Sequence, residues 1–392
     1  MYEHLAVPAP DEILQLAAAY REDTRTYKVD LGIGVYRDNQ GRSPVMRAIK
    51  KAEQLVLNAE DTKAYLGLAG DEAFNQAMRE LLFGRGATSA RASVVQTPGG
   101  SGAVRLLFEL VYRANPAAKV WISDPSWSNH QPMAEAAGLA AGTYRYLDRQ
   151  RQALAFEQMM ADLQNARKGD IVVLHACCHN PTGVNLTIEH WRLLAEYFNR
   201  SGAIPMVDIA YQGLGEGLDE DVQGLRHLAE NVQVLLLAAS CSKSFGLYRD
   251  RVGCAVLLGN SPQLLVARAN LLSLARVNYS FPPDHGAAVV RTVWNDASLR
   301  SEWSSELEDM RVRLQSNRGA FASAMALALG NNRFDFIRAQ TGMFSLLGLS
   351  KSTIEDLRAS RAIFMPSDGR INVAGLTTTV IASLSDALQG HC

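Results

Sequence analysis

The sequence predicts an α/β protein built on a parallel sheet that is buried on both faces. The first observation is a set of short, nearly continuous hydrophobic runs, as expected for strands that are covered on both sides. These runs are VWISD (120–124), IVVLH (171–175), IPMVD (204–208), VLLLA (234–238) and CAVLL (254–258). The second observation is that amphipathic helical runs lie between several of the strands, which is an α/β pattern.

The third observation is the position of the polar motifs, which follow four consecutive predicted strands. DPSW follows the first run, CCHNPTG the second and SCSK the fourth, while DIAYQG overlaps the end of the third. Ligands bind at the carboxyl ends of strands in open α/β sheets. We therefore expect the four motifs to converge on one pocket.

The clearest helical run is LTIEHWRLLAEYFNRSG at 186–202. Its apolar residues recur near helical spacing, which predicts a helix with one buried face. Thr187 can cap the start of this helix, and Gly202 can end it.

The C-terminal third follows a different pattern and predicts a second domain. Residues 301–328 form one long helical run, which we expect to bridge two domains. The segments FDFIRAQTGMFSLLGLS and GRINVAGL then indicate a smaller α+β unit. The predicted division is an N-terminal arm at 1–11, a small domain made of 12–45 and 311–392, and a large domain at 46–310.

Composition excludes several classes of partner. The 392 residues carry a net charge of −1 and no block of Lys or Arg, so we expect neither nucleic acid nor a membrane surface as a partner. No apolar run reaches the roughly 18 residues of a membrane span, and the N-terminus lacks the basic start of a secretory signal. The five cysteines include no C-x-x-C pair, which predicts reduced thiols in a cytoplasmic protein and no metal site.

Lys243 lies in the stretch SCSKSFGLYRDRVG (240–253), directly after an apolar strand. A lysine in a partly desolvated site has a lowered pKa and can attack an aldehyde, whereas an ordinary lysine forms a surface salt bridge. Ser240, Ser242 and Arg251 can together bind a phosphate. A lysine beside a phosphate site fits pyridoxal 5′-phosphate, whose aldehyde forms a Schiff base with lysine.

A second phosphate-binding element is the glycine-rich turn of QTPGGSGAVRLLFELVYRA (96–114), which opens directly into a helix. Gly100 and Ser101 lie at the helix N-terminus, where free N–H groups and the helix dipole attract an anion. The signal is weak by itself, because the turn matches neither G-x-G-x-x-G nor a nucleotide phosphate loop.

Four more residues suit the other parts of the cofactor. Asp208 can pair with the ring nitrogen and keep the ring an electron sink. Tyr211 and Asn180 can hydrogen-bond the phenolic oxygen, and Trp127 can stack on the ring. Taken singly, Asp208 can equally be a helix cap, Asn180 a turn residue and Trp127 a core residue.

Together these motifs resemble the fold-type I, subgroup I aminotransferases of the aspartate and aromatic-amino-acid kind, which depend on pyridoxal phosphate. The resemblance runs nearly end to end and includes five further motifs. These are VDLGIGVYRD (29–38), TKAYLGLAG (62–70), NYSFPP (278–283), GMFS (342–345) and GRINVAG (369–375). It implies a mostly parallel seven-stranded sheet sandwiched by helices, with a smaller α+β domain.

The resemblance also implies roles around the cofactor. Lys243 is the Schiff-base lysine that shuttles the proton, Asp208 pairs with the ring nitrogen and His130 supports that aspartate. Asn180 and Tyr211 bind the phenolic oxygen, and Trp127 stacks on the ring. The implied phosphate cup consists of Gly100, Ser101, Ser240, Ser242 and Arg251, with Tyr65 reaching it from the neighbouring subunit.

The substrate-binding residues are also implied by the resemblance. Arg370 forks onto the α-carboxylate, Arg276 binds a side-chain carboxylate from the partner subunit, and Gly34 belongs to a loop that closes over substrate, beside Trp127 and Asn180. This arrangement requires a homodimer with shared active sites. The alternative for Arg276 is a surface residue on the helix LLSLAR.

The expected reaction is a ping-pong transfer of the amino group from aspartate, aromatic amino acids (Phe, Tyr, Trp) or both to 2-oxoglutarate, which forms glutamate and a 2-oxo acid. The alternatives are another reaction of the same cofactor, such as β-elimination or decarboxylation, a transaminase of a specialised pathway, or a non-enzymatic binding protein.

Three departures from the family pattern bear on specificity and closure. Phe281 occupies a place where asparagine or serine is common, and Ser101 stands where many aspartate enzymes carry threonine. The segment SRAIFMPSDGR has Ala362 at a glycine position, so we expect an altered closure geometry of the small domain.

Overall fold

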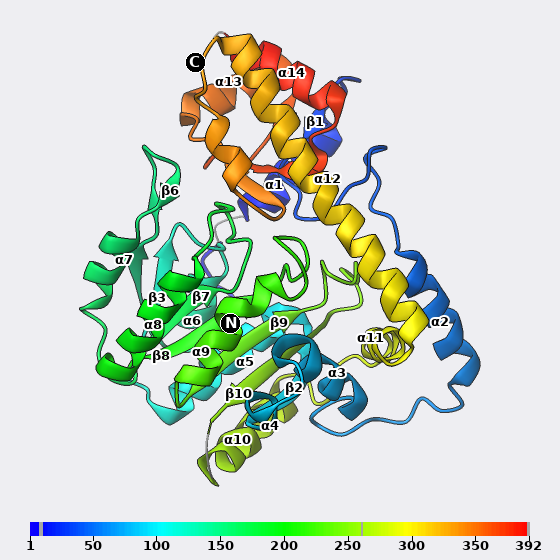
Figure 1. The fold of residues 1–392 in the computed structure, drawn as a ribbon, viewed down its shortest axis with the longest axis vertical. Coiled ribbons are helices and arrows are strands. Elements are labelled where there is room, and N and C mark those ends of the chain that lie inside the picture. The colour runs from blue at the N-terminus through cyan, green and yellow to red at the C-terminus, as the bar shows by residue number, and fades with distance from the viewer. Residues whose placement is uncertain (8–10, 260–261, 390–392) are drawn as a thin grey trace.

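The computed structural model describes residues 1–7, 11–259 and 262–389. Residues 8–10 of the predicted arm and Cys392 lie outside this range. A large body contains the main sheet, and a smaller unit is joined to it by the long helix α12 (Ala297–Leu329) (Figure 1).

The main sheet has seven strands in the order β2-β10-β9-β8-β7-β3-β4. Their bounds are β2 (Ala92–Pro98), β3 (Lys119–Asp124), β4 (Ala140–Arg145), β7 (Ile171–His175), β8 (Ile204–Ile209), β9 (Leu235–Ser240) and β10 (Val252–Leu258). Neighbouring strands are parallel except at β10, which is antiparallel to both β2 and β9. The predicted mostly parallel sheet is confirmed, while the run at 254–258 is a strand of the opposite direction.

The sheet is buried on both faces, which explains the continuous hydrophobic runs. Along β7, Ile171 and Val173 pack into one apolar cluster, while Val172 and Leu174 pack into the other. One face is covered by α5 (Gly99–Ala114), α6 (His130–Ala136) and α10 (Pro262–Asn278). The other is covered by α3 (Glu72–Phe83), α7 (Phe156–Leu163), α8 (Ile188–Ser201), α9 (Gln223–Asn231) and α11 (His285–Asn295).

Helix α8 begins and ends where its sequence predicts. The Thr187 hydroxyl accepts a hydrogen bond from the backbone N–H of His190, and Gly202 ends the helix in the left-handed region at φ 72°. Two further helices and a hairpin complete the body: α2 (Arg47–Ala59), α4 (Ala87–Ala90), β5 (Leu147–Asp148) and β6 (Ala153–Leu154).

The smaller unit combines an early segment of the chain with a late one. Two short sheets lie here, β1 (Val29–Asp30) with β12 (Ile363–Phe364) and β11 (Phe344–Leu346) with β13 (Arg370–Asn372). Its helices are α1 (Glu12–Glu22), α13 (Lys351–Arg361) and α14 (Thr378–Leu388), and it holds 3₁₀ turns at Asp335–Ala339 and Val373–Gly375. A third 3₁₀ turn, Glu220–Val222, precedes α9 in the large body. The domain boundaries predicted from the sequence stay a prediction.

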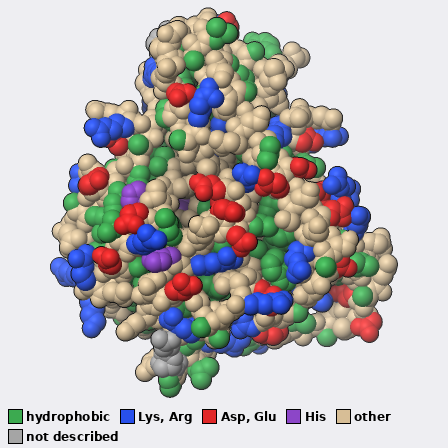
Figure 2. Space-filling model, viewed as in Figure 1, with side chains coloured by type: hydrophobic (Ala, Val, Ile, Leu, Met, Phe, Trp, Pro, Cys, Tyr) green, Lys and Arg blue, Asp and Glu red, His purple; other side chains and the backbone are tan. Residues whose placement is uncertain are grey.

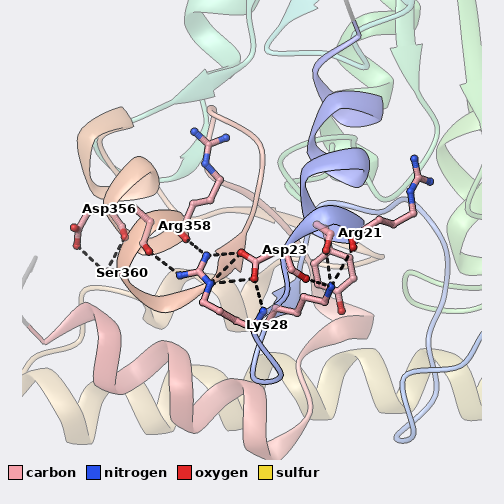
Figure 3. Close-up of polar contacts among 9 residues, drawn as sticks. Arg21, Asp23, Lys28, Asp356, Arg358 and Ser360 are labelled. Carbon is pink, nitrogen blue, oxygen red and sulfur yellow. Dashed lines mark hydrogen bonds and ion pairs between the residues drawn. The ribbon is translucent and has the colours of Figure 1, made fainter.

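A charged cluster joins the N-terminal segment to α13 (Figure 3). Arg25 pairs with Asp23 and donates hydrogen bonds to the carbonyl groups of Arg358 (2.9 Å) and Ala359 (2.7 Å). Lys28 donates to the carbonyl group of Tyr20 at 2.8 Å. The last carbonyls of α1 and α13 thereby gain cationic partners, which suits the helix dipole.

Ala362 ends α13 in the left-handed region, with φ 53°. An alanine there is strained relative to the glycine that this position usually carries. Even so, the backbone continues into the parallel pairing of β12 with β1. The expected change in closure geometry therefore remains a prediction.

Two features of the structure bear on nucleic acid and membranes as partners: the distribution of surface charge and the character of the helices. Acidic and basic side chains are interspersed over the face shown in Figure 2. Within the described ranges, no helix combines the length and apolar character that crossing a membrane requires.

Helix α12 supports the backbone next to Lys243 through Trp303. The indole of this fully buried residue donates a hydrogen bond to the carbonyl group of Ser244 at 2.8 Å and stacks on Phe245 with ring centroids 4.4 Å apart.

We therefore expect Trp303→Phe to lower the free energy of unfolding by about 1–2 kcal/mol, since the buried Ser244 carbonyl loses its donor. Urea denaturation followed by circular dichroism measures the change. The control is Trp294→Phe, because the half-buried Trp294 makes only a 3.4 Å bond to Glu80. An equal loss in both variants would contradict this account of Trp303.

Candidate active site

The four polar motifs meet in one cavity at the carboxyl ends of β3, β7, β8 and β9, as the sequence predicts. The antiparallel direction of β10 adds to this convergence, because it brings the start of that strand, and Arg251 before it, to the same edge. The cavity is lined by Gly100, Ser101, Trp127, His175, Cys177, Asn180, Asp208, Ala210, Tyr211, Ser240, Ser242, Lys243 and Arg251.

Lys243 points its amine into this cavity from the turn that follows β9. The Nζ atom lies 5.2 Å from the centre of the Tyr211 ring. Burial lowers the pKa of Lys243 to about 8, the Asp208 carboxylate opposes this shift, and the Arg251 charge adds to it. About a tenth of the molecules therefore carry a neutral amine at pH 7, far more than for an ordinary lysine, and this neutral form is a nucleophile and a base.

A chain of hydrogen bonds reaches Asp208 from behind the cavity. The backbone N–H of Asn180 donates to His175 Nδ1 (3.2 Å), so neutral His175 carries its proton on Nε2, facing Ser126 Oγ at 3.3 Å. The Ser126 hydroxyl can then donate to His130 Nδ1 (2.9 Å), and His130 Nε2 donates to Asp208 Oδ2 (2.9 Å). The Asn180 backbone N–H thus fixes the tautomers of His175 and His130, so that His130 presents an N–H to Asp208.

The same chain determines the charge of Asp208. Burial by itself raises the pKa of this carboxyl, but the hydrogen bond from His130 and, to a smaller extent, the charge of Lys243 hold the pKa below its usual value. Burial lowers the pKa of His175 to about 3, so this ring is neutral at physiological pH. Burial also raises the pKa of Tyr211, which keeps its hydroxyl protonated. The cavity therefore holds an anion, a titratable amine and a phenol that can donate.

The other end of the cavity is a cradle suited to a phosphate. The helix α5 starts at Gly99 and Gly100, where a Cβ atom on Gly100 would lie 2.9 Å from the Ser240 Cβ atom. The Arg251 guanidinium lies 3.5 Å from Ser242 Oγ and would crowd a Cβ atom on Gly99 at 2.7 Å. Helix N–H groups, hydroxyls and a guanidinium are the donors that bind phosphate, so this end fits the phosphate of pyridoxal phosphate.

Arg370 approaches the cavity from β13 of the smaller unit. Its Nη1 lies 3.5 Å from Asn180 Oδ1, its Nη2 donates to the carbonyl group of Gly32 at 3.0 Å, and its guanidinium packs over the Phe344 ring at 4.5 Å. Gly34 lies on the nearby loop, facing the same ring. These contacts leave the guanidinium at the mouth of the cavity, beside Asn180.

Tyr65 and Arg276 are not among the cavity-lining residues of their own chain. Tyr65 is 84% exposed and stacks on Phe281, with ring centroids 4.8 Å apart. Arg276 donates to Ser280 Oγ at 3.0 Å, and its guanidinium lies 5.5 Å from the same Phe281 ring. These residues form an exposed cluster around Phe281, separate from the cavity.

Several residues of the site were missed by the sequence reasoning. His175 ends a predicted strand and Cys177 lies in a predicted motif, but neither was assigned to the cavity. Ser126 belongs to the DPSW motif, and its link to His175 depends on the distance between the ends of β3 and β7.

Comparison with known proteins agrees with this geometry. A family model described as aminotransferase class I and II matches residues 26–388. An aromatic-amino-acid aminotransferase of Paracoccus denitrificans is 43% identical over 389 residues, and an aspartate aminotransferase of Escherichia coli strain K12 is 42% identical over 392; each match covers 99% of both chains. The crystal structure of an aromatic-amino-acid aminotransferase from Burkholderia pseudomallei, covalently bound to pyridoxal phosphate, has a TM-score of 0.96 and 36% identity, covering 100% of this chain and 99% of that one.

The charges around Lys243 predict how its amine titrates. We expect Lys243 of the cofactor-free protein to be acetylated with a midpoint near pH 8. Asp208→Asn should move that midpoint lower, because burial then acts without the opposing carboxylate. Acetylation across a pH series, quantified by mass spectrometry of the Lys243 peptide, measures both midpoints.

Lys50, which is exposed on α2, serves as the control in the same samples and should give one profile in both proteins. A Lys243 midpoint near the ordinary lysine value of about 10.4, or one unchanged by Asp208→Asn, would contradict this electrostatic account.

Proposed function

The chain belongs to the class I and II aminotransferases, and we propose that it transfers the amino group of aspartate and of aromatic amino acids to 2-oxoglutarate. The observation that carries the proposal is the Lys243 amine, which shares one cavity with the Asp208 carboxylate and the phosphate cradle. Relatives named for aspartate, aromatic amino acids and tyrosine, at 42–45% identity, support the range of amino donors.

Pyridoxal phosphate is the cofactor of this family, and the residues of the cavity fit each part of it. When bound, it supplies an aldehyde that condenses with amines and a ring that accepts the electron pair left at Cα. Asp208 would face the ring nitrogen, Trp127 would stack on the ring, and Asn180 and Tyr211 would bind the phenolic oxygen. The phosphate would be held by Gly100, Ser101, Ser240, Ser242 and Arg251.

The protein groups divide the proton chemistry between them. Lys243 takes the proton from the substrate Cα atom at its Nζ atom and returns a proton in the same cavity, which a pKa near 8 allows at neutral pH. Asp208 stays ionised because His130 donates to it, and an anion there favours a protonated ring nitrogen. The Tyr211 hydroxyl, kept protonated by burial, donates a hydrogen bond throughout.

Two arginines would bind the substrate carboxylates: Arg370 the α-carboxylate, and Arg276, from the partner subunit, a side-chain carboxylate. Arg370 suits the α-carboxylate, since it lies at the mouth of the cavity and presents a planar pair of donors. Gly34 belongs to the loop that would close over the bound substrate. The amino donor leaves as a 2-oxo acid before the acceptor enters, so both carboxylic acids use this one site in turn.

The protein would act as a homodimer. Tyr65 and Arg276 lie on the surface, outside the cavity of their own chain, and the partner subunit would receive them at its phosphate cradle and substrate pocket. The Phe281 ring, which contacts both residues, would bring them to the partner as one unit.

The state of the cysteines supports a cytoplasmic location. Cys177, Cys178, Cys241 and Cys254 are free, which suits the reducing cytoplasm, where cell fractionation should find the protein.

We propose the domain division at 46–310 for the large domain and 12–45 with 311–392 for the small one, after an arm at 1–11. Limited proteolysis that cleaves only near these junctions would support it.

Substrate specificity can be tested with a matched pair of arginine variants. With 2-oxoglutarate as acceptor, we expect measurable kcat/KM for both aspartate and phenylalanine. Arg276→Leu should lower kcat/KM for aspartate by at least about 100-fold and leave phenylalanine within about threefold, because of the two donors only aspartate has a side-chain carboxylate to lose its partner. The side-chain carboxylate of 2-oxoglutarate does not affect this comparison, since in a ping-pong reaction kcat/KM for a donor depends only on the donor's half-reaction. Arg370→Leu should lower both strongly. Activity with one donor class alone, or release of ammonia or carbon dioxide, would refute the proposal.

The shared site can be tested by mixing two variants that each have little or no activity with aspartate. Lys243→Ala and Arg276→Leu subunits, dissociated and reassociated together, should regain up to a quarter of the wild-type aspartate activity, because half the subunits form hybrids and each hybrid has one intact site. No recovery despite proven subunit exchange would show that Arg276 serves its own chain.

A further inference from the structure

A second group of reactive side chains lies behind the cavity. The thiols of Cys177 and Cys178 and the carboxylate of Asp221 are all buried, and one ligand atom from each lies within 4.8 Å of the others. The sequence indicated no such group, because Asp221 is distant along the chain and the two cysteines are adjacent rather than spaced as C-x-x-C.

The backbone fixes all three side chains in place. Cys178 takes the left-handed conformation at φ 49°, which turns the chain sharply between the two thiols. The Asp221 carboxylate accepts hydrogen bonds from the backbone N–H groups of Gly213 (2.8 Å), Gly215 (2.9 Å) and Glu216 (2.8 Å). A carboxylate has about four acceptor positions, so these bonds orient Asp221 and leave it able to bind a cation.

A cavity outside the cofactor site gives access to this group. Cys177 lines both cavities, while Asp221 and Gln340 line only the outer one. Gln340 is 2% exposed, and its Oε1 accepts from the Ser345 hydroxyl at 2.6 Å. Its Nε2 has no partner among the described residues, so a residue that lines this cavity holds a buried donor without an acceptor. A water or anion held by a metal ion would supply one.

The nearby charge also favours an anionic complex. Arg318 is fully buried, and every group that accepts its hydrogen bonds is neutral. These are the Ser345 hydroxyl and the carbonyl groups of Thr341, Gly342 and Phe344. The Thr341 hydroxyl lies 3.8 Å from Cys178 Sγ, so the same turn joins the guanidinium to the thiols. A buried cation paired only with neutral groups is stabilised by a nearby anion.

We propose that Cys177, Cys178 and Asp221 form a binding site for a thiophilic divalent cation of the Zn²⁺ class, with a water as fourth ligand next to Gln340. Zn²⁺ takes sulfur ligands at about 2.3 Å and carboxylate oxygens at about 2.0–2.2 Å in tetrahedral geometry, which places two sulfur atoms about 3.7 Å apart. About 1 Å of side-chain adjustment therefore closes the site.

The charges and protons of binding balance. The cation replaces the protons of the two thiols, which pass to the solvent, and the complex with two thiolates and one carboxylate carries a net charge of −1. The Arg318 guanidinium offsets this charge. Because Cys177 also lines the cofactor cavity, occupancy would connect metal availability to the state of the active site.

Cadmium is the probe for the test, because cadmium–thiolate bonds absorb in the ultraviolet. The holoenzyme with reduced thiols is dialysed against Cd²⁺ in metal-free buffer. We expect one Cd²⁺ per chain together with the thiolate absorption. Cys177→Ser and Cys178→Ser should each weaken binding by at least about tenfold, whereas Cys254→Ser, which replaces a buried cysteine of β10 outside the group, should bind as the wild type does.

X-ray absorption of the Zn²⁺-loaded wild-type holoenzyme gives an answer even if the serine variants fail to fold. We expect two sulfur neighbours near 2.3 Å and oxygen neighbours near 2.0–2.2 Å. Absence of tight binding, coordination by oxygen and nitrogen alone, or unchanged Cd²⁺ affinity in both folded serine variants would overturn the proposal. None of these results depends on the transaminase activity.

Discussion

Burial of the Lys243 amine beside the Asp208 carboxylate is the interaction on which the rest of the site depends. A buried amine becomes neutral, and a buried carboxyl likewise tends to become neutral. The active site needs a Lys243 amine that can become neutral, and it must keep the Asp208 carboxyl ionised. It does so with the donor from His130, which holds the Asp208 pKa down while burial brings the Lys243 pKa to about 8. The histidine and serine chain behind Asp208 is therefore part of the active-site electrostatics.

The sheet topology supplies the positions that this interaction requires. Parallel β7, β8 and β9 end at one edge, which brings Asn180, Asp208 and Lys243 together from three separate turns. One antiparallel strand, β10, enters the sheet at that edge and brings Arg251 to the cradle at the start of α5. An all-parallel sheet would carry Arg251 to the opposite edge, so the reversed strand is what completes the candidate phosphate cradle.

Much of this could be predicted from the sequence, because most cavity residues lie in short motifs at strand ends. The edge strands could not be predicted in this way: β4 buries only one of its six residues, and β2 buries the polar side chains of Gln96 and Thr97, so neither forms a continuous apolar run. The chain through Ser126 and the approach of Asp221 to the thiols depend on distances between turns. The positions of Tyr65 and Arg276 outside the cavity of their own chain agree with the resemblance, which implies that both act from the neighbouring subunit.

Helix α12 links the two ends of the active site mechanically. Trp303 near its start holds the carbonyl group next to Lys243, while Arg318 holds the turn that leads into β11. Phe344 on that strand packs against Arg370. The 15 residues from Trp303 to Arg318 span about 22 Å of helix. Since both anchors are fully buried, the smaller unit can approach the sheet only if α12 bends between them or its anchors shift. A closure of the smaller unit over a substrate at Arg370, as proposed above, would therefore be transmitted along the same helix that supports the Lys243 turn.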